Sequence, residues 1–150
     1  MMVLALLAER RGALDEALKT YEDVLALRPH FAPAMRQMAV IYSHSHKDGD
    51  LDQAYNLAQQ ARGTMPDDLE LAKTLGILAF RRSDYNRSML LLRETSEKSR
   101  TDGEVFYYLG MDYDKLKNTN ECRLALQEAL DLRIPDILAA PARRILNGLK

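Results

Sequence analysis

Gly12-Ala-Leu-Asp-Glu-Ala-Leu-Lys-Thr-Tyr-Glu-Asp-Val-Leu-Ala-Leu-Arg-Pro29 is the stretch that decides the fold. Its apolar residues recur with a helical period, so one broad face of the predicted helix is apolar. Gly12 can end a preceding helix with a positive φ, and Pro29 disfavours helix at Arg28. Glycine and proline residues that end helices recur further along the chain, which indicates a repeated helical unit.

Composition narrows the class of protein. The 150-residue chain is 47% hydrophobic, which suffices for one well-buried domain or a short repeat array. Its 21 basic and 22 acidic residues give a net charge of −1, whereas a nucleic-acid-binding protein usually has a basic excess. No apolar stretch is long enough to span a membrane, so we expect a soluble protein with no membrane partner. The compartment stays open, with the cytoplasm favoured.

The periodicity predicts helices throughout, because no segment alternates with period two. The first helix, over residues 1–11, is apolar nearly all round, which is typical of burial on two sides. It is interpreted as the cut end of a longer array. Further helices are expected over about 12–27, 34–45, 51–63, 67–82, 84–98, 101–116 and 118–134, followed by a closing helix with Pro141 near its first turn. The predicted caps are Asp67 or Asp68, Thr101 with Glu104, and Asn118 with Glu121.

Superposing the helix pairs at a spacing of about 34 residues aligns small residues where two helices must approach closely. In the first helix of each pair this position holds Ala5, Ala39, Gly76 and Gly110. In the second helix one position holds Ala17, Ala54, Ser88 and Cys122, and a later one holds Val24, Ala61, Thr95 and Ala129. Larger residues are expected beside them as buried knobs, namely Leu4, Met38, Leu75 and Leu109.

These positions resemble the tetratricopeptide repeat (TPR) family, whose consensus has Leu-Gly and Tyr in the first helix, then Gly, Ala, an aromatic residue, Ala-Leu and Pro. The matching residues are Gly12, Ala17, Tyr21, Leu25 and Pro29, then Tyr42, Gly49, Ala54, Ala61 and Pro66, then Leu75, Gly76, Asp84 and Tyr85, then Leu109, Gly110, Tyr113, Ala129 and Leu130. Ser83 and Lys117 replace the consensus glycine, Ser88 and Cys122 the alanine, and Arg100 and Ile134 the proline. The resemblance covers nearly the whole chain.

The resemblance implies an all-α fold, a right-handed superhelix (α-solenoid) of antiparallel helix pairs. We expect a single array with repeats over about 1–31, 32–68, 69–102 and 103–135, and a closing helix over 136–150. The chain is interpreted as a fragment of a longer protein.

Stacked helix pairs leave one face of each first helix on a concave surface. By the repeat register, that surface begins with Met2 and Leu6. The predicted partner-binding residues on it are Arg36, Gln37, Val40, Lys73, Ile77, Phe80, Arg81, Tyr107, Tyr108 and Met111. Apolar and aromatic side chains interleaved with basic ones suit the anchoring of an extended or helical peptide. The alternative is that the apolar members pack between neighbouring helices and the charges are solvated.

No residue set indicates catalysis, and neither a cofactor nor a metal is predicted. His44 and His46 precede three aspartates in a metal-like cluster, but this segment also suits a solvated loop with a glycine stop. Cys122 occupies a helix-contact position, where packing is the expected role. No catalytic Ser or His spacing and no glycine-rich phosphate loop is found.

The leading hypothesis is therefore a non-catalytic scaffold for protein–protein interaction. Its alternative is a structural spacer that self-associates through the first helix. An RNA-binding helical repeat is disfavoured by the balanced charge, and a regulatory domain fused to an enzyme stays open. The Lys/Asn/Arg clamp with which some TPR relatives grip a C-terminal carboxylate is not matched, since the corresponding positions hold Met2, Leu6, Gln37, Glu70 and Thr74.

Overall fold

The computed structural model describes residues 1–149 and, within them, is built from nine α-helices without a strand. In chain order these are α1 (Met2–Arg10), α2 (Leu14–Leu27), α3 (Ala32–Ser43), α4 (Asp50–Thr64), α5 (Leu69–Arg81), α6 (Tyr85–Lys98), α7 (Gly103–Lys115), α8 (Thr119–Asp131) and α9 (Asp136–Gly148). The all-α class predicted from the sequence is confirmed. None of the described helices combines the length and apolar content that a membrane crossing requires.

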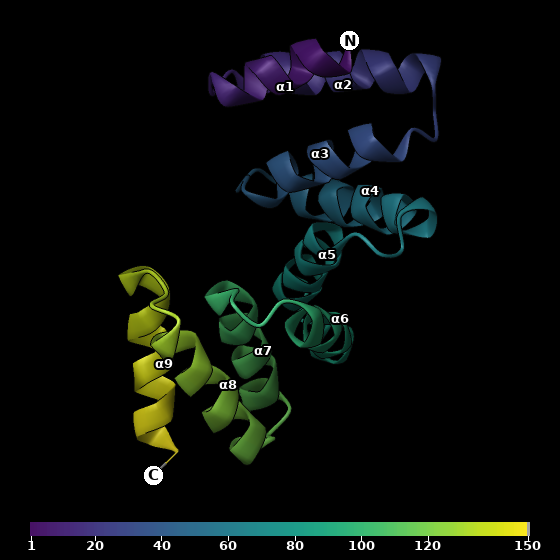
Figure 1. The fold of residues 1–150 in the computed structure, drawn as a ribbon. Coiled ribbons are helices and arrows are strands. Elements are labelled where there is room, and N and C mark those ends of the chain that lie inside the picture. The colour runs from purple at the N-terminus through teal and green to yellow at the C-terminus, as the bar shows by residue number, and fades with distance from the viewer. Residues whose placement is uncertain (150) are drawn as a thin grey trace. The chain divides into compact units, whose positions relative to one another are not determined.

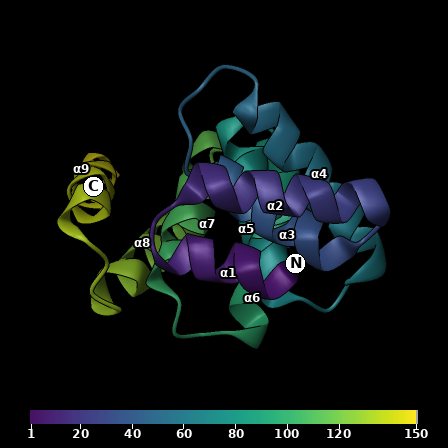
Figure 2. The ribbon, with the colours of Figure 1, turned by 90° about the horizontal axis from the view of Figure 1, so that it is seen from above.

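The chain forms two compact units, Met1–Thr74 (unit 1) and Leu75–Lys150 (unit 2), and their boundary falls inside α5. In unit 1, α1 lies beside α2, α3 lies beside α4, and α2 also packs on α3 (Figures 1 and 2). In unit 2, α7 contacts α6 on one side and α8 on the other, and α9 packs on α7 and α8 (Figure 1). Each unit is therefore a stack of antiparallel helix pairs.

The turn inside each helix pair uses a residue with positive φ. These are Gly12 (75°), Gly49 (85°), Ser83 (63°) and Lys117 (63°). Three of the turns share one hydrogen bond, in which a backbone N–H donates to the carbonyl five residues earlier. It joins Ala13 to Ala8, Asp84 to Ala79 and Asn118 to Tyr113 at 2.8–2.9 Å. This bond satisfies a carbonyl that the helix end leaves without a partner.

The predicted contact positions lie in the core. Ala17, Ala54, Ser88 and Cys122 are each 0% exposed. In α7, a methyl group at Gly110 would come within 2.5 Å of Leu126 Cδ2, and in α5 one at Gly76 would come within 2.7 Å of Leu92 Cδ2. Helices at these two points approach too closely for a Cβ to fit without movement of a buried leucine.

Three predictions about the first helix and the helix starts are wrong. Only Ala5 and Ala8 of α1 are buried, and Leu4 is 62% exposed, so α1 buries one narrow stripe instead of two sides. Thr101 does not cap α7. Asp102 does, because its Oδ1 accepts hydrogen bonds from the backbone N–H groups of Glu104 and Val105.

The other helix starts differ from the predicted ones by small shifts or in the residue that caps them. Of the two cap candidates before α5, Asp68 is the cap, and its Oδ1 accepts from Leu71 N at 2.8 Å. Asn118 is at the N-cap of α8 but makes no side-chain cap bond. Helix α9 begins at Asp136, so Pro141 lies inside the helix and not near its first turn. Helix α3 begins at Ala32, two residues earlier than predicted, because Pro33 fits the first turn.

Candidate functional site

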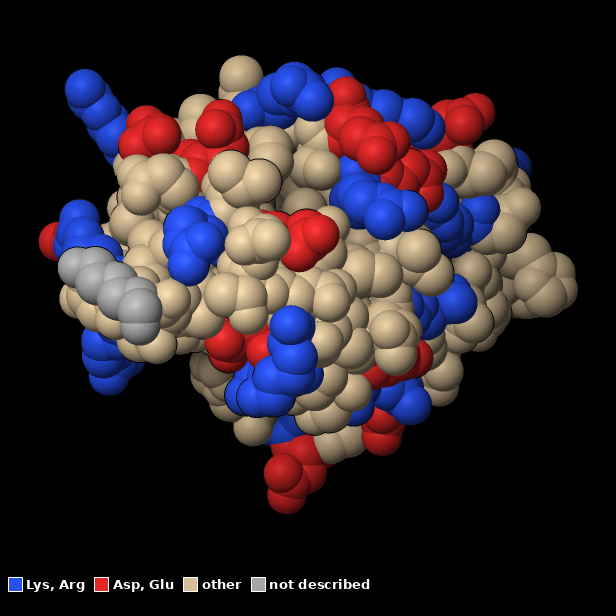
Figure 3. Space-filling model, turned by 90° about the horizontal axis from the view of Figure 1, so that it is seen from below, with Lys and Arg blue, Asp and Glu red and all other residues tan. Residues whose placement is uncertain are grey.

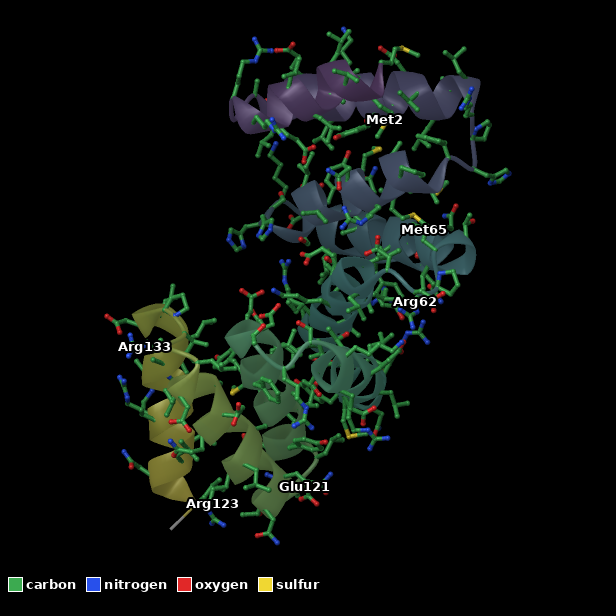
Figure 4. All side chains as sticks on the ribbon, in the orientation of Figure 1. Met2, Arg62, Met65, Glu121, Arg123 and Arg133 are labelled. Carbon is green, nitrogen blue, oxygen red and sulfur yellow. The ribbon has the colours of Figure 1, made fainter. Side chains whose placement is uncertain are left out.

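Unit 1 holds a shallow cavity, open to solvent and of about 280 Å³, between α1, α3 and the segment that joins α4 to α5. Figure 4 labels Met2 on α1 and Met65 at the end of α4. The lining residues are Met2, Leu6, Pro33, Arg36, Gln37, Met65 and Asp68. Four of them are apolar and three are polar, and this is the mixture that peptide-binding pockets use.

The polar wall is held by Arg36 of α3. Its Nε donates to Asp68 Oδ2 at 3.0 Å, while Asp68 Oδ1 caps α5 through Leu71 N. One carboxylate therefore fixes both the start of α5 and the guanidinium of Arg36. The side chains of Arg36 and Asp68 are 25% and 19% exposed, so the pair is partly shielded from water and fixed in one geometry.

The same wall continues through Gln37 to the first helix pair. Arg36 Nη1 donates to Gln37 Oε1 at 2.6 Å, and Gln37 Nε2 donates to Glu9 Oε2 at 3.2 Å. The hydroxyl of Tyr21, a buried residue of α2, donates to the same Glu9 oxygen. Burial and the bond to Glu9 raise the pKa of the Tyr21 hydroxyl.

These bonds form one network across α2, α1, α3 and the cap of α5. Every polar side chain of the cavity already has a partner, which holds it in place before any ligand arrives. Preorganised polar groups lower the conformational entropy lost on binding. The part of the wall left for a partner is apolar, made by Met2, Leu6, Pro33 and Met65.

Unit 2 gathers the predicted aromatic residues of α5 and α7. Phe80 lies edge-to-face on Tyr108 with ring centroids 5.3 Å apart, and Tyr108 lies edge-to-face on Tyr107 at 5.1 Å. Tyr85 also lies edge-to-face on Phe80, with ring centroids 5.5 Å apart. Tyr107 is only 7% exposed, and burial raises the pKa of its hydroxyl while Arg144 of α9 opposes that effect. Phe80 and Tyr108 are half-buried and keep surface for a partner.

The other predicted site residues are dispersed. Ile77 and Met111 are half-buried against the core of unit 2, which fits the alternative of packing between neighbours. Arg81 is half-buried at the end of α5. Val40 and Lys73, half-buried in unit 1, do not line its cavity. Of the ten predicted residues, the structure thus brings Arg36 and Gln37 together in unit 1, and Phe80, Tyr107 and Tyr108 together in unit 2.

Four residues of the unit 1 site were not predicted as such. Pro33, Met65 and Asp68 line the cavity, and Glu9 accepts the two bonds that tie Gln37 and Tyr21 together. The sequence identified Asp68 only as a helix cap. Its second oxygen faces a residue of the preceding helix pair, and no local pattern reports that distance.

Cys122 is buried, whereas the two histidines of the metal-like segment are exposed. Within residues 1–149 no group of three or more His, Cys, Asp and Glu side chains could hold a metal ion. His44 and His46 are exposed, and Asp50 accepts a bond from the Ser45 hydroxyl. Burial raises the pKa of the Cys122 thiol to about 11, which suppresses the reactive thiolate. On the face drawn in Figure 3, basic and acidic groups are interspersed among uncharged ones.

Comparison with known proteins supports the fold. No family model matches the chain, and no curated protein matches it. Several solved structures, in contrast, match the fold of the chain. MamA from Desulfovibrio magneticus RS-1 superposes with a TM-score of 0.78 at 19% identity, covering 97% of this chain and 78% of that one. MamA AMB-1 superposes at 0.77 with 20% identity, covering 97% and 94%.

The chain is similar in fold to MamA. MamA is a TPR-like protein, so the likeness establishes an all-α solenoid fold of the kind the sequence predicted. At this level of identity it supports the TPR resemblance through structure alone.

Proposed function

We propose that this chain is a non-catalytic scaffold that binds a segment of another protein through the first helices of its helix pairs. The single observation that carries the proposal is the unit 1 cavity. Its Arg36, Gln37 and Asp68 side chains are fixed by one another and by Glu9, while Met2, Leu6, Pro33 and Met65 leave an apolar wall beside them. A site of this kind accepts an apolar side chain of an extended segment.

The aromatic cluster of unit 2 supports the same proposal. Phe80 and Tyr108 are half-buried and belong to first helices, and aromatic residues are enriched among those that dominate binding energy. Arg81 follows Phe80 in the last turn of α5 and adds a positive charge to this end of the helix.

A random peptide library displayed on phage and selected on the whole chain tests the proposal. An enriched peptide, labelled and measured by fluorescence anisotropy, is expected to lose about tenfold or more in affinity when Leu6 is changed to Ser or Tyr108 to Ala. The matched control is Leu4→Ser, because Leu4 is on the same helix as Leu6, is 62% exposed and does not line the cavity.

Equal binding by Leu6→Ser, Tyr108→Ala and the parent chain contradicts the proposed face. Selection of no peptide after repeated rounds contradicts the scaffold function itself.

Self-association is the second candidate, favoured by the surface of α1. Val3, Leu4 and Leu7 are 69%, 62% and 49% exposed, which places three aliphatic side chains in water on one short helix. Sedimentation velocity over a hundredfold range of protein concentration tests it. A sedimentation coefficient that rises with concentration, and that ceases to rise in Leu4→Ser/Leu7→Ser, supports self-association. A constant monomer excludes it.

A further inference from the structure

A carboxylate lies in the middle of unit 2 without a charged partner. Asp112 of α7 is 0% exposed. Its Oδ2 accepts a hydrogen bond of 2.6 Å from the hydroxyl of Ser88 on α6, so the pair sits at the α6–α7 contact. Its Oδ1 is buried and has no hydrogen-bond partner among the described residues. An ionised carboxylate with one hydrogen bond is an expensive group to bury.

The repeat register shows that the fold does not need this group. One repeat earlier the position of Asp112 holds Leu78, and two repeats earlier it holds Ile41, which are 0% and 8% exposed. The position of Ser88 holds Ala54 and Ala17 in the preceding repeats, and both are 0% exposed. Unit 2 thus carries a polar pair where the other repeats carry an aliphatic side chain and an alanine.

None of the groups that act on the Asp112 carboxyl within the described residues carries a positive charge. Helix α6 contributes Ser88 and, at its N-cap, Asp84, which has the same sign of charge. Helix α8 contributes the Cys122 thiol, which is influenced by Asp114 of α7. Helix α9 contributes Arg144, whose charge acts on Tyr107. No Lys, Arg or His within residues 1–149 forms an ion pair with Asp112.

We propose that Asp112 is a proton-binding switch in unit 2, so that the α6–α7 contact is tight when the carboxyl group is protonated and weakens when the proton leaves. Protonation removes the buried charge, and Ser88 keeps its hydrogen bond to Oδ2 in both states. Burial, opposed by the Ser88 hydrogen bond and reinforced by Asp84, raises the pKa of Asp112 to about 7.

The direction of the pH effect follows from the two end states. An aspartate in the unfolded chain has a pKa of about 3.9, whereas burial raises the pKa of Asp112 in the fold to about 7. The folded state therefore holds a proton that the unfolded state has released between these values. Stability from this group is fully present below about pH 4 and is lost as the pH rises to about 7. The unfolding constant rises on the order of a hundredfold between pH 5 and pH 8 from this group alone.

The switch concerns the helix that carries Tyr108 of the proposed binding surface and two further residues that the sequence predicts to bind a partner. Tyr107, Tyr108 and Met111 are on α7 together with Asp112. Loss of the proton near neutral pH loosens the contact that positions α7 against α6. The burial of Asp112 and its place in the repeat are independent of the proposed function.

Urea unfolding of the whole chain at pH 5, 6, 7 and 8 tests the switch by comparing the parent with Asp112→Asn, which is isosteric and cannot ionise. We expect the ratio of the parent unfolding constant to that of Asp112→Asn to rise by on the order of a hundredfold across this range. Asp114→Asn is the matched control on the same helix and is expected to leave the pH dependence of the parent in place.

A second measurement does not depend on any variant. The Asp112 side-chain carbonyl carbon, followed by NMR in the folded parent chain, is expected to titrate with a midpoint near 7. A midpoint below 5, or parallel stability profiles for the parent and Asp112→Asn, overturns the proposal.

Discussion

The hairpins of unit 1 turn at Gly12 and Gly49, whereas those of unit 2 turn at Ser83 and Lys117, and all four residues hold a positive φ. This conformation is easy for glycine and unfavourable for a residue with a Cβ. The turn geometry in unit 2 is therefore imposed by the helices on either side of it. The packing of the pair decides the backbone conformation, and the local residue preference does not.

The helix contacts show the reverse distribution. Where two helices approach most closely, unit 1 has Ala5 and Ala39, whereas unit 2 has Gly76 and Gly110. In unit 2 a glycine is thus found inside the helix, where it allows closer packing, and is missing from the turn. The two units reach similar hairpins through different residues, and so they are expected to respond differently to the same substitution.

The largest expected effect comes from replacing the polar pair of unit 2 by the apolar pair found at the same repeat positions in unit 1. The double variant Ser88→Ala/Asp112→Leu puts an alanine where unit 1 has Ala17 and an aliphatic side chain where unit 1 has Ile41. We expect the free energy of unfolding at pH 8 to rise by about 2–4 kcal/mol, because a buried carboxylate is replaced by an aliphatic side chain. Urea unfolding at pH 8 checks this. A loss of stability at pH 8 would show that the polar pair is part of the packing of unit 2.

The next effect concerns the close approach of α7 and α8. Gly110→Ala places a methyl group 2.5 Å from Leu126 Cδ2 and 3.2 Å from Leu126 N. We expect the free energy of unfolding to fall by about 1–3 kcal/mol, since Leu126 is fully buried and cannot move freely.

The matched substitution in unit 1 is Ala39→Gly, whose cost is about 1–2 kcal/mol and comes from helix propensity together with the loss of a buried methyl group. Thermal unfolding of both variants gives the comparison. An unchanged or raised melting temperature for Gly110→Ala would contradict the close contact.

Restoring glycine to the turns of unit 2 has a smaller effect of opposite sign. Ser83→Gly and Lys117→Gly are each expected to stabilise by about 0.5–1 kcal/mol, because both residues have φ near 63°. Gly12→Ala, as the control in unit 1, is expected to destabilise. Chemical unfolding midpoints decide the sign, and destabilisation by the two glycine substitutions would contradict an imposed turn.

The smallest effect concerns the Arg36–Asp68 pair. Asp68→Asn keeps a good N-cap for α5 and removes the negative charge that faces Arg36. A loss of about 0.5 kcal/mol is expected, as for a partly exposed ion pair, and it should shrink in high salt. A loss of the same size at low and high salt would assign the effect to the cap and not to the pair.

Much of the fold follows from the sequence, because helical period and a fixed spacing are properties of the chain itself. Ala17, Ser88 and Cys122 were predicted as contact positions and are fully buried. The cap of α7 could not be decided in this way, since Thr101 and Asp102 are neighbours and both suit an N-cap. The exposure of Leu4 could not be predicted from the apolar pattern of α1 either, because it depends on which helices pack against α1.

The candidate site was predicted less completely. The register placed Arg36, Gln37, Phe80 and Tyr108 on first helices, and the structure places them there. The register did not predict that Asp68 pairs with Arg36, because that contact depends on how two helix pairs stack. The burial of Tyr107 was also not apparent, because a tyrosine on a first helix fits packing as well as binding.

Hydrogen–deuterium exchange of the whole chain, with and without a peptide selected on it, tests the central claim most directly. Binding on the first-helix face predicts slower exchange in Met2–Arg10 and Ala32–Ser43 for a peptide held by unit 1, or in Gly103–Lys115 for one held by unit 2. Slower exchange confined to Leu14–Leu27, Asp50–Thr64, Tyr85–Lys98 or Thr119–Asp131 would place the peptide on the second helices and contradict the account.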